Sequence, residues 1–372
     1  MEYSGKPIWN SDTREKFRNI TVKTPDEDIR RKVLSNFDHV AKPIDGLGRF
    51  ETLLAQIGAI QGTERIDISD KAVIIMCADN GIVEEGISQS GQEVTLAVVK
   101  SMAAQKSSVG KMAESAGADT IPVDIGVNCK EKIPGVIDKK IAPGTRNFMK
   151  EPAMTEEEAV RAIFTGIEMV FQCKEKGYKL LATGEMGIGN TTTSSAVTAA
   201  LLGCEAAEVT GRGAGLSDEK LVHKQELIAE AIDRYGLKEA DALRILETVG
   251  GLDIAGLAGV CIGGAMYHVP IILDGVISMT AALLAERLVP GTRDYLLPSH
   301  RGKEPAVERL TKALGAEPVI DAELALGEGT GAVMMFPLLD MALNVYQDST
   351  TFTDIRIEQY ERFRNSSDHL ND

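Results

Sequence analysis

The chain has 372 residues, 44% hydrophobic and 26% charged, and its 55 acidic and 40 basic residues give a formal net charge of −15. This composition is typical of a globular protein with a sizeable core, and it excludes a disordered or collagen-like chain. The acidic balance argues against nucleic acid as a partner, and no apolar run is long enough for a membrane span.

The elements expected first along the chain are helices, followed by short buried strands. Residues 49–60 repeat apolar side chains at helical spacing, which predicts a helix. Four short runs rich in Val, Ile and Leu predict strands at 72–77, 120–125, 179–183 and 269–273. Because continuously apolar runs suit strands buried on both faces, we expect a parallel sheet.

Longer amphipathic stretches separate these strands. Thr155 and Glu158 have the spacing of a capping box, which predicts the start of a helix. Single helices are also predicted at 91–116, 194–202, 217–232 and 330–346. Alternation of strands and helices predicts an α/β fold with a doubly wound, mostly parallel sheet covered by helices on both faces.

The strongest local signal is the glycine-rich segment GEMGIGNTTT at 184–193, between a predicted strand and a predicted helix. Ligands bind beyond the carboxyl ends of strands in such sheets, and free N–H groups at a helix start favour phosphate. The alternative is a helix cap after a tight turn. The glycine spacing matches neither a Walker loop nor GxGxxG, so a dinucleotide-dependent redox enzyme is not favoured.

Two further glycine-rich segments are candidates for a site. GRGAGL at 211–216 precedes a predicted helix that carries Lys224, and Arg212 or Lys224 either pairs with a phosphate or is a solvated charge. LGEGTGA at 326–332 places Glu328 between two glycines. Glu328 is either a catalytic carboxylate or a charge at a helix N-terminus. The helix would lower the pKa of Glu328, whereas burial would raise it.

Metal ligands are sparse in the sequence. Asp79, Asp253 and Asp274 follow glycine-rich or strand-like segments and either bind ribose hydroxyls or a metal, or cap the next helix. The five histidines form neither HxH nor HExxH, so we expect no metal site. The five cysteines are widely spaced and form no CxxC, which indicates reduced thiols and a cytoplasmic location.

Together these segments resemble one enzyme family, the nicotinate-nucleotide–dimethylbenzimidazole phosphoribosyltransferases. The matching stretches are KP at 42–43, LGRFE at 47–51, AD at 78–79, EGIS at 85–88, DIGV at 124–127, PAMT at 152–155, GEMGIGNTT at 184–192, LDG at 273–275, SH at 299–300 and LGEGTGA at 326–332. The resemblance implies a homodimer without cofactor. It also implies a large α/β nucleotide-binding domain, placed at 66–298, and a small helical domain formed by 1–65 and 299–372.

The resemblance further implies a reaction of cobalamin lower-ligand synthesis. Nicotinate mononucleotide donates ribose 5-phosphate to 5,6-dimethylbenzimidazole or a similar aromatic base, giving an α-riboside 5′-phosphate and nicotinate. Glu328 matches the family's general base, which removes a ring proton from the attacking azole. The substrate-binding residues implied are Glu185, Gly187, Asn190, Thr191, Thr192, Lys224, Asp274 and Ser90.

The sequence departs from the family pattern at several positions. Asp45 and Gly46 replace a Gly-Ser pair, Asn80 replaces a histidine, Gly302 a serine and Ala325 an arginine. These departures leave the acceptor open between a benzimidazole, a purine and a phenol. Two other functions stay open: a metal-dependent phosphohydrolase built on the three aspartates, and a riboside-phosphate binding protein without catalysis.

Overall fold

The structure is a computed structural model that describes residue 17 and residues 19–362. Contacts divide the chain into two compact units. Of the described residues, the larger unit contains those up to 24 and 69–335, and the smaller unit contains 25–68 and 336–362. The outer ends of the predicted small domain, 1–16 and 363–372, and residue 18 lie outside the described residues.

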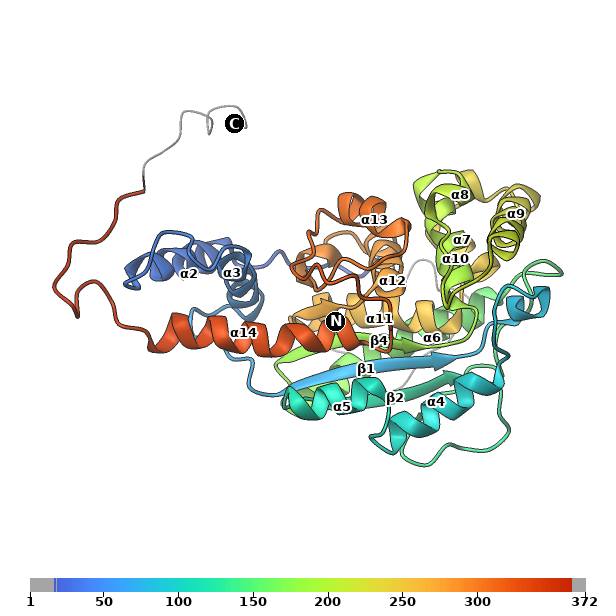
Figure 1. Ribbon diagram of the computed structural model, residues 1–372, viewed down its shortest axis with the longest axis horizontal. Helices are drawn as coiled ribbons and strands as arrows, with labels where there is room; N and C mark the ends of the chain where they lie inside the picture. Colours follow the sequence, from blue (N-terminus) through green and yellow to red (C-terminus); the bar gives the residue numbers. More distant parts are fainter. Residues whose placement is uncertain (1–16, 18, 363–372) are drawn as a thin grey trace. The chain divides into compact units, whose positions relative to one another are not determined.

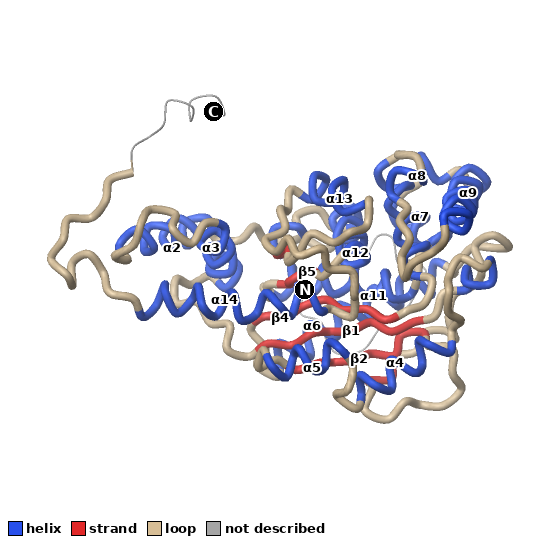
Figure 2. The backbone as a smooth tube through the Cα atoms, in the orientation of Figure 1, coloured by secondary structure: helices blue, strands red, loops and turns tan. Residues whose placement is uncertain are grey.

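The larger unit is built on one six-stranded sheet within the described residues (Figures 1 and 2). Its strands are β1 (Lys71–Ala78), β2 (Asp119–Gly126), β3 (Ile137–Asp138), β4 (Leu180–Met186), β5 (Ile271–Leu273) and β6 (Leu296–Pro298). Each strand pairs in parallel with its neighbour, in the order β3-β2-β1-β4-β5-β6. This is the order of a doubly wound sheet, so the predicted fold class is confirmed.

Helices cover both faces of this sheet (Figure 1). The helices of the larger unit are α4 (Glu93–Ala103), α5 (Ser108–Ser115), α6 (Glu156–Glu175), α7 (Asn190–Leu202), α8 (Ala206–Val209), α9 (Asp218–Arg234), α10 (Ala242–Val249), α11 (Leu252–Tyr267), α12 (Val276–Leu288) and α13 (Ala306–Leu314), with the 3₁₀ helices η1 (Gly81–Glu85), η2 (Leu237–Glu239) and η3 (Thr292–Tyr295). Gly256 of α11 packs against Met76 of β1, whereas Gly329 packs against Val73. Since these two β1 side chains are three positions apart, they point to opposite faces.

Most predicted elements are confirmed, including the capping box. Thr155 Oγ1 accepts from the Glu158 N–H (3.1 Å), and the Glu158 carboxylate accepts from the Thr155 N–H (2.7 Å). The single helix predicted at 91–116 is wrong, because the chain forms α4 and α5 there. Gln105 has a left-handed backbone (φ 55°), and Ser107 caps α5 by accepting from the Gly110 N–H (3.2 Å).

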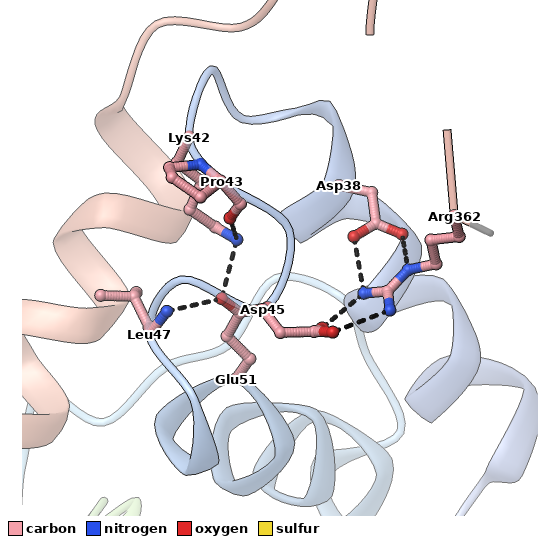
Figure 3. Close-up of polar contacts among 7 residues, drawn as sticks. All are labelled: Asp38, Lys42, Pro43, Asp45, Leu47, Glu51 and Arg362. Atoms are coloured by element: carbon pink, nitrogen blue, oxygen red, sulfur yellow. Dashed lines mark hydrogen bonds and ion pairs between the residues drawn. The ribbon is translucent and has the colours of Figure 1, made fainter. Parts of the chain in front are cut away.

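The smaller unit contains α2 (Glu27–His39), α3 (Arg49–Gln61) and the C-terminal part of α14 (Thr330–Asp348). Figure 3 shows its loop between α2 and α3, where Lys42 forms an ion pair with the buried Glu51 (2.7 Å). Arg362 bridges Asp38 and Asp45 in the same view. Asp45, one of the departures from the family pattern, therefore has a partner near the end of the described chain.

The observed boundaries differ from the predicted domains. Residues 299–335, predicted in the small domain, belong to the larger unit. The physical reason is that α13 packs on α12, and that Gly329 and Gly331, just before and inside the first turn of α14, contact the sheet and the loop after β6. No helix in the described part of the chain is both long enough and apolar enough to cross a membrane.

Candidate active site

A pocket of about 320 Å³ opens in the larger unit beyond the carboxyl ends of β4, β5 and β6. In a doubly wound sheet this edge is where ligands bind. The predicted site residues in its lining are Glu185, Gly187, Asn190, Thr191, Asp274 and Glu328. Residues far apart in the sequence therefore converge on one cavity, as the motif positions predicted.

Three predicted residues lie outside the pocket lining. Lys224 is buried directly behind Thr191, and its Nζ donates to the Thr191 hydroxyl (3.0 Å). Thr192 is fully buried, and its hydroxyl has no hydrogen-bond partner among the described residues. Ser90 precedes α4, and its N–H donates to the hydroxyl of Ser88 (3.2 Å). Lys224 reaches the pocket through Thr191, whereas Thr192 and Ser90 contribute no surface to it.

Glu328 stands in an unusual turn at the pocket wall. Gly327, Glu328 and Gly329 all have left-handed backbones, with φ of 85°, 63° and 94°. This conformation is uncommon for a residue with a side chain, and the flanking glycines adopt it at little cost. The turn projects the half-buried carboxylate toward α5, where Glu328 Oε2 accepts from the Val109 N–H (3.1 Å).

The sequence left open whether the pKa of Glu328 is raised by burial or lowered by a helix N-terminus, and its surroundings give the direction. Burial raises the pKa of this carboxyl, the hydrogen bond from Val109 lowers it, and the charge of Asp274 raises it, with a net rise. The helix end that meets Glu328 is that of α5, not of the α14 that follows it in sequence. A half-buried carboxylate with a raised pKa is suited to accept a proton near neutral pH.

A second acid, Glu185, lies in the wall formed by β4 and is buried. The side-chain amide of Asn190 donates to Glu185 and also to Asp253 Oδ2 (3.1 Å). Burial, with the nearby charge of Asp253, raises the pKa of Glu185 to about 8, and burial raises the pKa of Asp253 to about 6. Asp253, which the sequence offered as a ligand of ribose or a metal or as a helix cap, lies fully buried in the first turn of α11, next to the residues that line the pocket.

The glycines of the 184–193 segment allow close backbone packing. A Cβ on Gly184 would lie 2.6 Å from the carbonyl oxygen of Glu328, and one on Gly187 would lie 2.2 Å from the carbonyl oxygen of Ala78. Both distances are too short for a side chain. Gly184 and Gly187 therefore let the Glu328 turn and the end of β1 approach the edge of β4.

Lys224 supplies positive charge on the opposite side of Thr191. Besides Thr191, its Nζ donates to the Gly211 carbonyl oxygen (3.2 Å). Burial lowers the pKa of Lys224 to about 8, and the charge of Glu304 raises it. Glu304, which lines the pocket, accepts from the Gly213 N–H (3.0 Å). The loop at 211–216 thus joins a buried lysine to the pocket wall.

Two lining residues, His300 and Glu304, received no role from sequence reasoning. His300 is buried, with Nδ1 3.0 Å from the Ser299 hydroxyl and 4.0 Å from Asp274 Oδ1. The Ser299-His300 pair was a signal for it, since it belongs to the family pattern. No sequence pattern indicated Glu304, because its place in the site depends on its contact with the loop at 211–216, which is distant in the sequence.

The three aspartates of the phosphohydrolase hypothesis do not assemble. Asp79 accepts from the Asn128 N–H (2.7 Å), Asp253 from Asn190, and Asp274 from the backbone after Glu328. In the described part of the chain, no three His, Cys, Asp or Glu side chains are grouped in a way that could hold a metal ion. All five cysteines are described, and none forms a disulfide.

Comparison with known proteins first gives the class. A family model described as phosphoribosyltransferase matches residues 22–357 of the chain. Among solved structures, the crystal structure of CobT from Thermus thermophilus superposes with a TM-score of 0.85 at 36% sequence identity, covering 90% of this chain and all of that one.

Relatives then give the particular family. A protein of Ruminiclostridium cellulolyticum named nicotinate-nucleotide–dimethylbenzimidazole phosphoribosyltransferase is 43% identical over 92% of this chain and 97% of its own length. A protein of the same name from Acetivibrio thermocellus is 44% identical over 91% of this chain and 95% of its own length. The chain belongs to this family of phosphoribosyltransferases, as its motifs predicted.

Proposed function

We propose that this enzyme transfers ribose 5-phosphate from nicotinate mononucleotide to 5,6-dimethylbenzimidazole or a similar aromatic base, as a step in the synthesis of the cobalamin lower ligand. The products are nicotinate and an α-linked riboside 5′-phosphate. The observation that carries the proposal is the half-buried Glu328 carboxylate, which faces a pocket whose other wall joins Thr191 to the buried Lys224.

The reaction exchanges one bond at the anomeric carbon for another. The bond from C1′ to the pyridinium nitrogen breaks, and its electron pair goes to the ring of nicotinate, which leaves as a stable aromatic molecule. A ring nitrogen of the acceptor attacks C1′ from the opposite face, which inverts the configuration. Glu328 takes the proton from the other nitrogen of the azole. Alignment of the two substrates supplies much of the remaining acceleration.

The two sides of the pocket suit the two substrates. Glu185, Gly187, Asn190, Thr191 and Lys224 form the nucleotide side, where the lysine and the threonine hydroxyl complement a phosphate. We expect the acceptor, an uncharged aromatic ring, to contact the apolar residues of the lining. These residues are Val98, Val276, Ile277, Leu324, Ala325 and Leu326.

We also propose a cytoplasmic homodimer. The resemblance to the family implies this assembly, and Met334 and Met341 on α14 are large apolar side chains that are 37% and 57% exposed. Light scattering of the purified protein measures the assembly directly: a mass twice that of the 40.0 kDa chain supports the dimer, and the mass of one chain contradicts it.

An acceptor assay tests the proposed reaction. The protein is incubated with nicotinate mononucleotide and a panel of benzimidazoles, purines and phenols, and products are identified by mass and by the configuration at C1′. We expect release of nicotinate in step with an α-linked product. A protein that binds the nucleotide but releases no nicotinate with any acceptor would support the binding-protein alternative.

A further inference from the structure

Asp274 holds the turn that carries Glu328. It follows β5 directly and is buried at the pocket wall. Its Oδ2 accepts from the Gly329 N–H (3.2 Å), and its Oδ1 accepts from the N–H groups of Gly331 (2.9 Å) and Ala332 (3.1 Å). One carboxylate therefore binds the residue after Glu328 and the first turn of α14.

These bonds occupy both oxygens of the side chain. The three N–H groups belong to the beginning of a helix and have no partner within the helix. The backbone of Asp274 is itself fixed, because its N–H donates to the Thr183 hydroxyl (3.2 Å). Thr183 is held in turn by the hydroxyl of Ser278 (2.9 Å) and the carbonyl oxygen of Ile272 (3.2 Å).

We infer that Asp274 is a positioning residue rather than a ligand of the substrate: its carboxylate fixes the left-handed turn that aims Glu328 into the pocket. This inference rests on the proposed role of Glu328 as the general base. It assigns a different function to a residue first expected to bind substrate, because a carboxylate with three backbone donors has little capacity left for ribose hydroxyls.

The charge of Asp274 has a second effect on the same base. The groups that face Glu328 are the Val109 N–H from α5, Asp274 after β5 and Glu185 from β4, whose carboxyl lies against the Gly327–Glu328 backbone. His300 lies 4.0 Å from the other side of Asp274. The negative charge of Asp274 raises the pKa of Glu328, so its removal should lower that pKa.

The substitution Asp274→Asn separates these effects from substrate binding. Asparagine can accept from Gly331 and Ala332 through its remaining oxygen, but it presents an NH₂ group to the Gly329 N–H and loses the bond beside Glu328. We expect kcat to fall about 10²-fold, the cost of a small misplacement of a reacting group, with KM for nicotinate mononucleotide changed less than a few-fold. We also expect the acid limb of the kcat–pH profile to move to lower pH.

The substitution Thr183→Val is the companion variant. It loosens the backbone of Asp274 and keeps its charge, so kcat should fall less than in Asp274→Asn and the acid limb should stay in place. If Asp274→Asn does not fold, Thr183→Val still tests positioning through the same split between kcat and KM.

The possible results are distinguishable. A raised KM with unchanged kcat in either variant would overturn the positioning role, and an acid limb that stays in place in Asp274→Asn would overturn the charge effect of Asp274 on Glu328. The variant Glu328→Gln is measured in parallel. If that variant turns over like the unmodified enzyme, the base assignment in the proposed function fails; if it is impaired while Asp274→Asn is not, only the inference about Asp274 fails.

Discussion

Two acids on the walls of one pocket have different environments. Glu185, at the end of β4, is 8% exposed and shares the amide of Asn190 with Asp253. Glu328 is half-buried and accepts from a helix N-terminus. Burial raises the pKa of both, and a nearby carboxylate raises each further, Asp253 that of Glu185 and Asp274 that of Glu328. Hydrogen bonds from Asn190 to Glu185 and from Val109 to Glu328 oppose these rises.

We infer from this difference that Glu185 has a structural role and that Glu328 exchanges a proton during the reaction. With a pKa of about 8, Glu185 stays mainly protonated at neutral pH and can hold its wall without charge repulsion. Glu328 is half-buried rather than buried, so its carboxylate can take up and release a proton during turnover. Substitutions at the two acids and in the walls around them test whether the two roles are distinct.

The largest expected effect is that of Glu328→Gln. Glutamine keeps the size and can still accept from Val109, but it cannot take a proton. We expect turnover to fall about 10²–10⁴-fold, the range for loss of a general base, while nucleotide binding is retained. Steady-state kinetics and a binding titration measure the two quantities, and turnover within a few-fold of the unmodified enzyme would remove Glu328 from the reaction.

The next effect is that of Lys224→Met on the nucleotide side. Methionine fills a similar volume without the charge. A charged hydrogen bond contributes about 1.5–3 kcal/mol, so the affinity for nicotinate mononucleotide should fall about 10–100-fold. Lys220→Met is the matched control, because Lys220 is exposed on the same helix, α9, and its variant should bind normally. Equal affinities in the two variants would contradict a role of Lys224 in binding.

Gly331→Ala should reduce stability beside the Glu328 turn. A Cβ there would lie 1.9 Å from Nδ1 of His300, so the imidazole or the start of α14 must shift. We expect a loss of about 1–3 kcal/mol in the free energy of unfolding, measured with denaturant. Gly302→Ala is the control for stability, since its Cβ would have no neighbour nearer than 3.6 Å. Equal free energies of unfolding for the two variants would show that the pocket wall beside Glu328 can move to accept the added methyl group.

A pH-dependent effect on stability concerns Glu185. Folding raises its pKa from near 4.5 to about 8, so between these values the folded chain holds a proton that the unfolded chain releases. The free energy of unfolding therefore contains a term, due to the proton on Glu185, that falls as the pH rises from about 4.5 to 8. Glu185→Gln removes this term, so its Tm should exceed that of the unmodified protein by a margin that grows with pH. A margin independent of pH would contradict the protonated state of Glu185.

Much of the fold could be predicted from local patterns. The run at 72–77 is continuously apolar because β1 is buried over its whole length, and this signal is present in the sequence itself. The break between α4 and α5 was missed, because a left-handed Gln105 has no distinctive signature among helix-compatible neighbours.

The site was predicted as a set of residues rather than as an arrangement. Motifs singled out Glu328, Glu185 and Lys224, but the direction of the Glu328 pKa depends on Val109, which comes from a distant part of the sequence. The contacts of Asp274 are with backbone N–H groups, which every residue except proline carries, so no side-chain pattern could reveal them. Long-range contacts of this kind require the fold.

The most direct test of the central claim is a crystal structure of the enzyme with its α-riboside 5′-phosphate product bound. The account predicts the carboxylate of Glu328 within hydrogen-bonding distance of the free ring nitrogen of the transferred base, with the phosphate on the side of Thr191 and Lys224. A product bound with its base turned away from Glu328, or with its phosphate beside that carboxylate, would contradict the account.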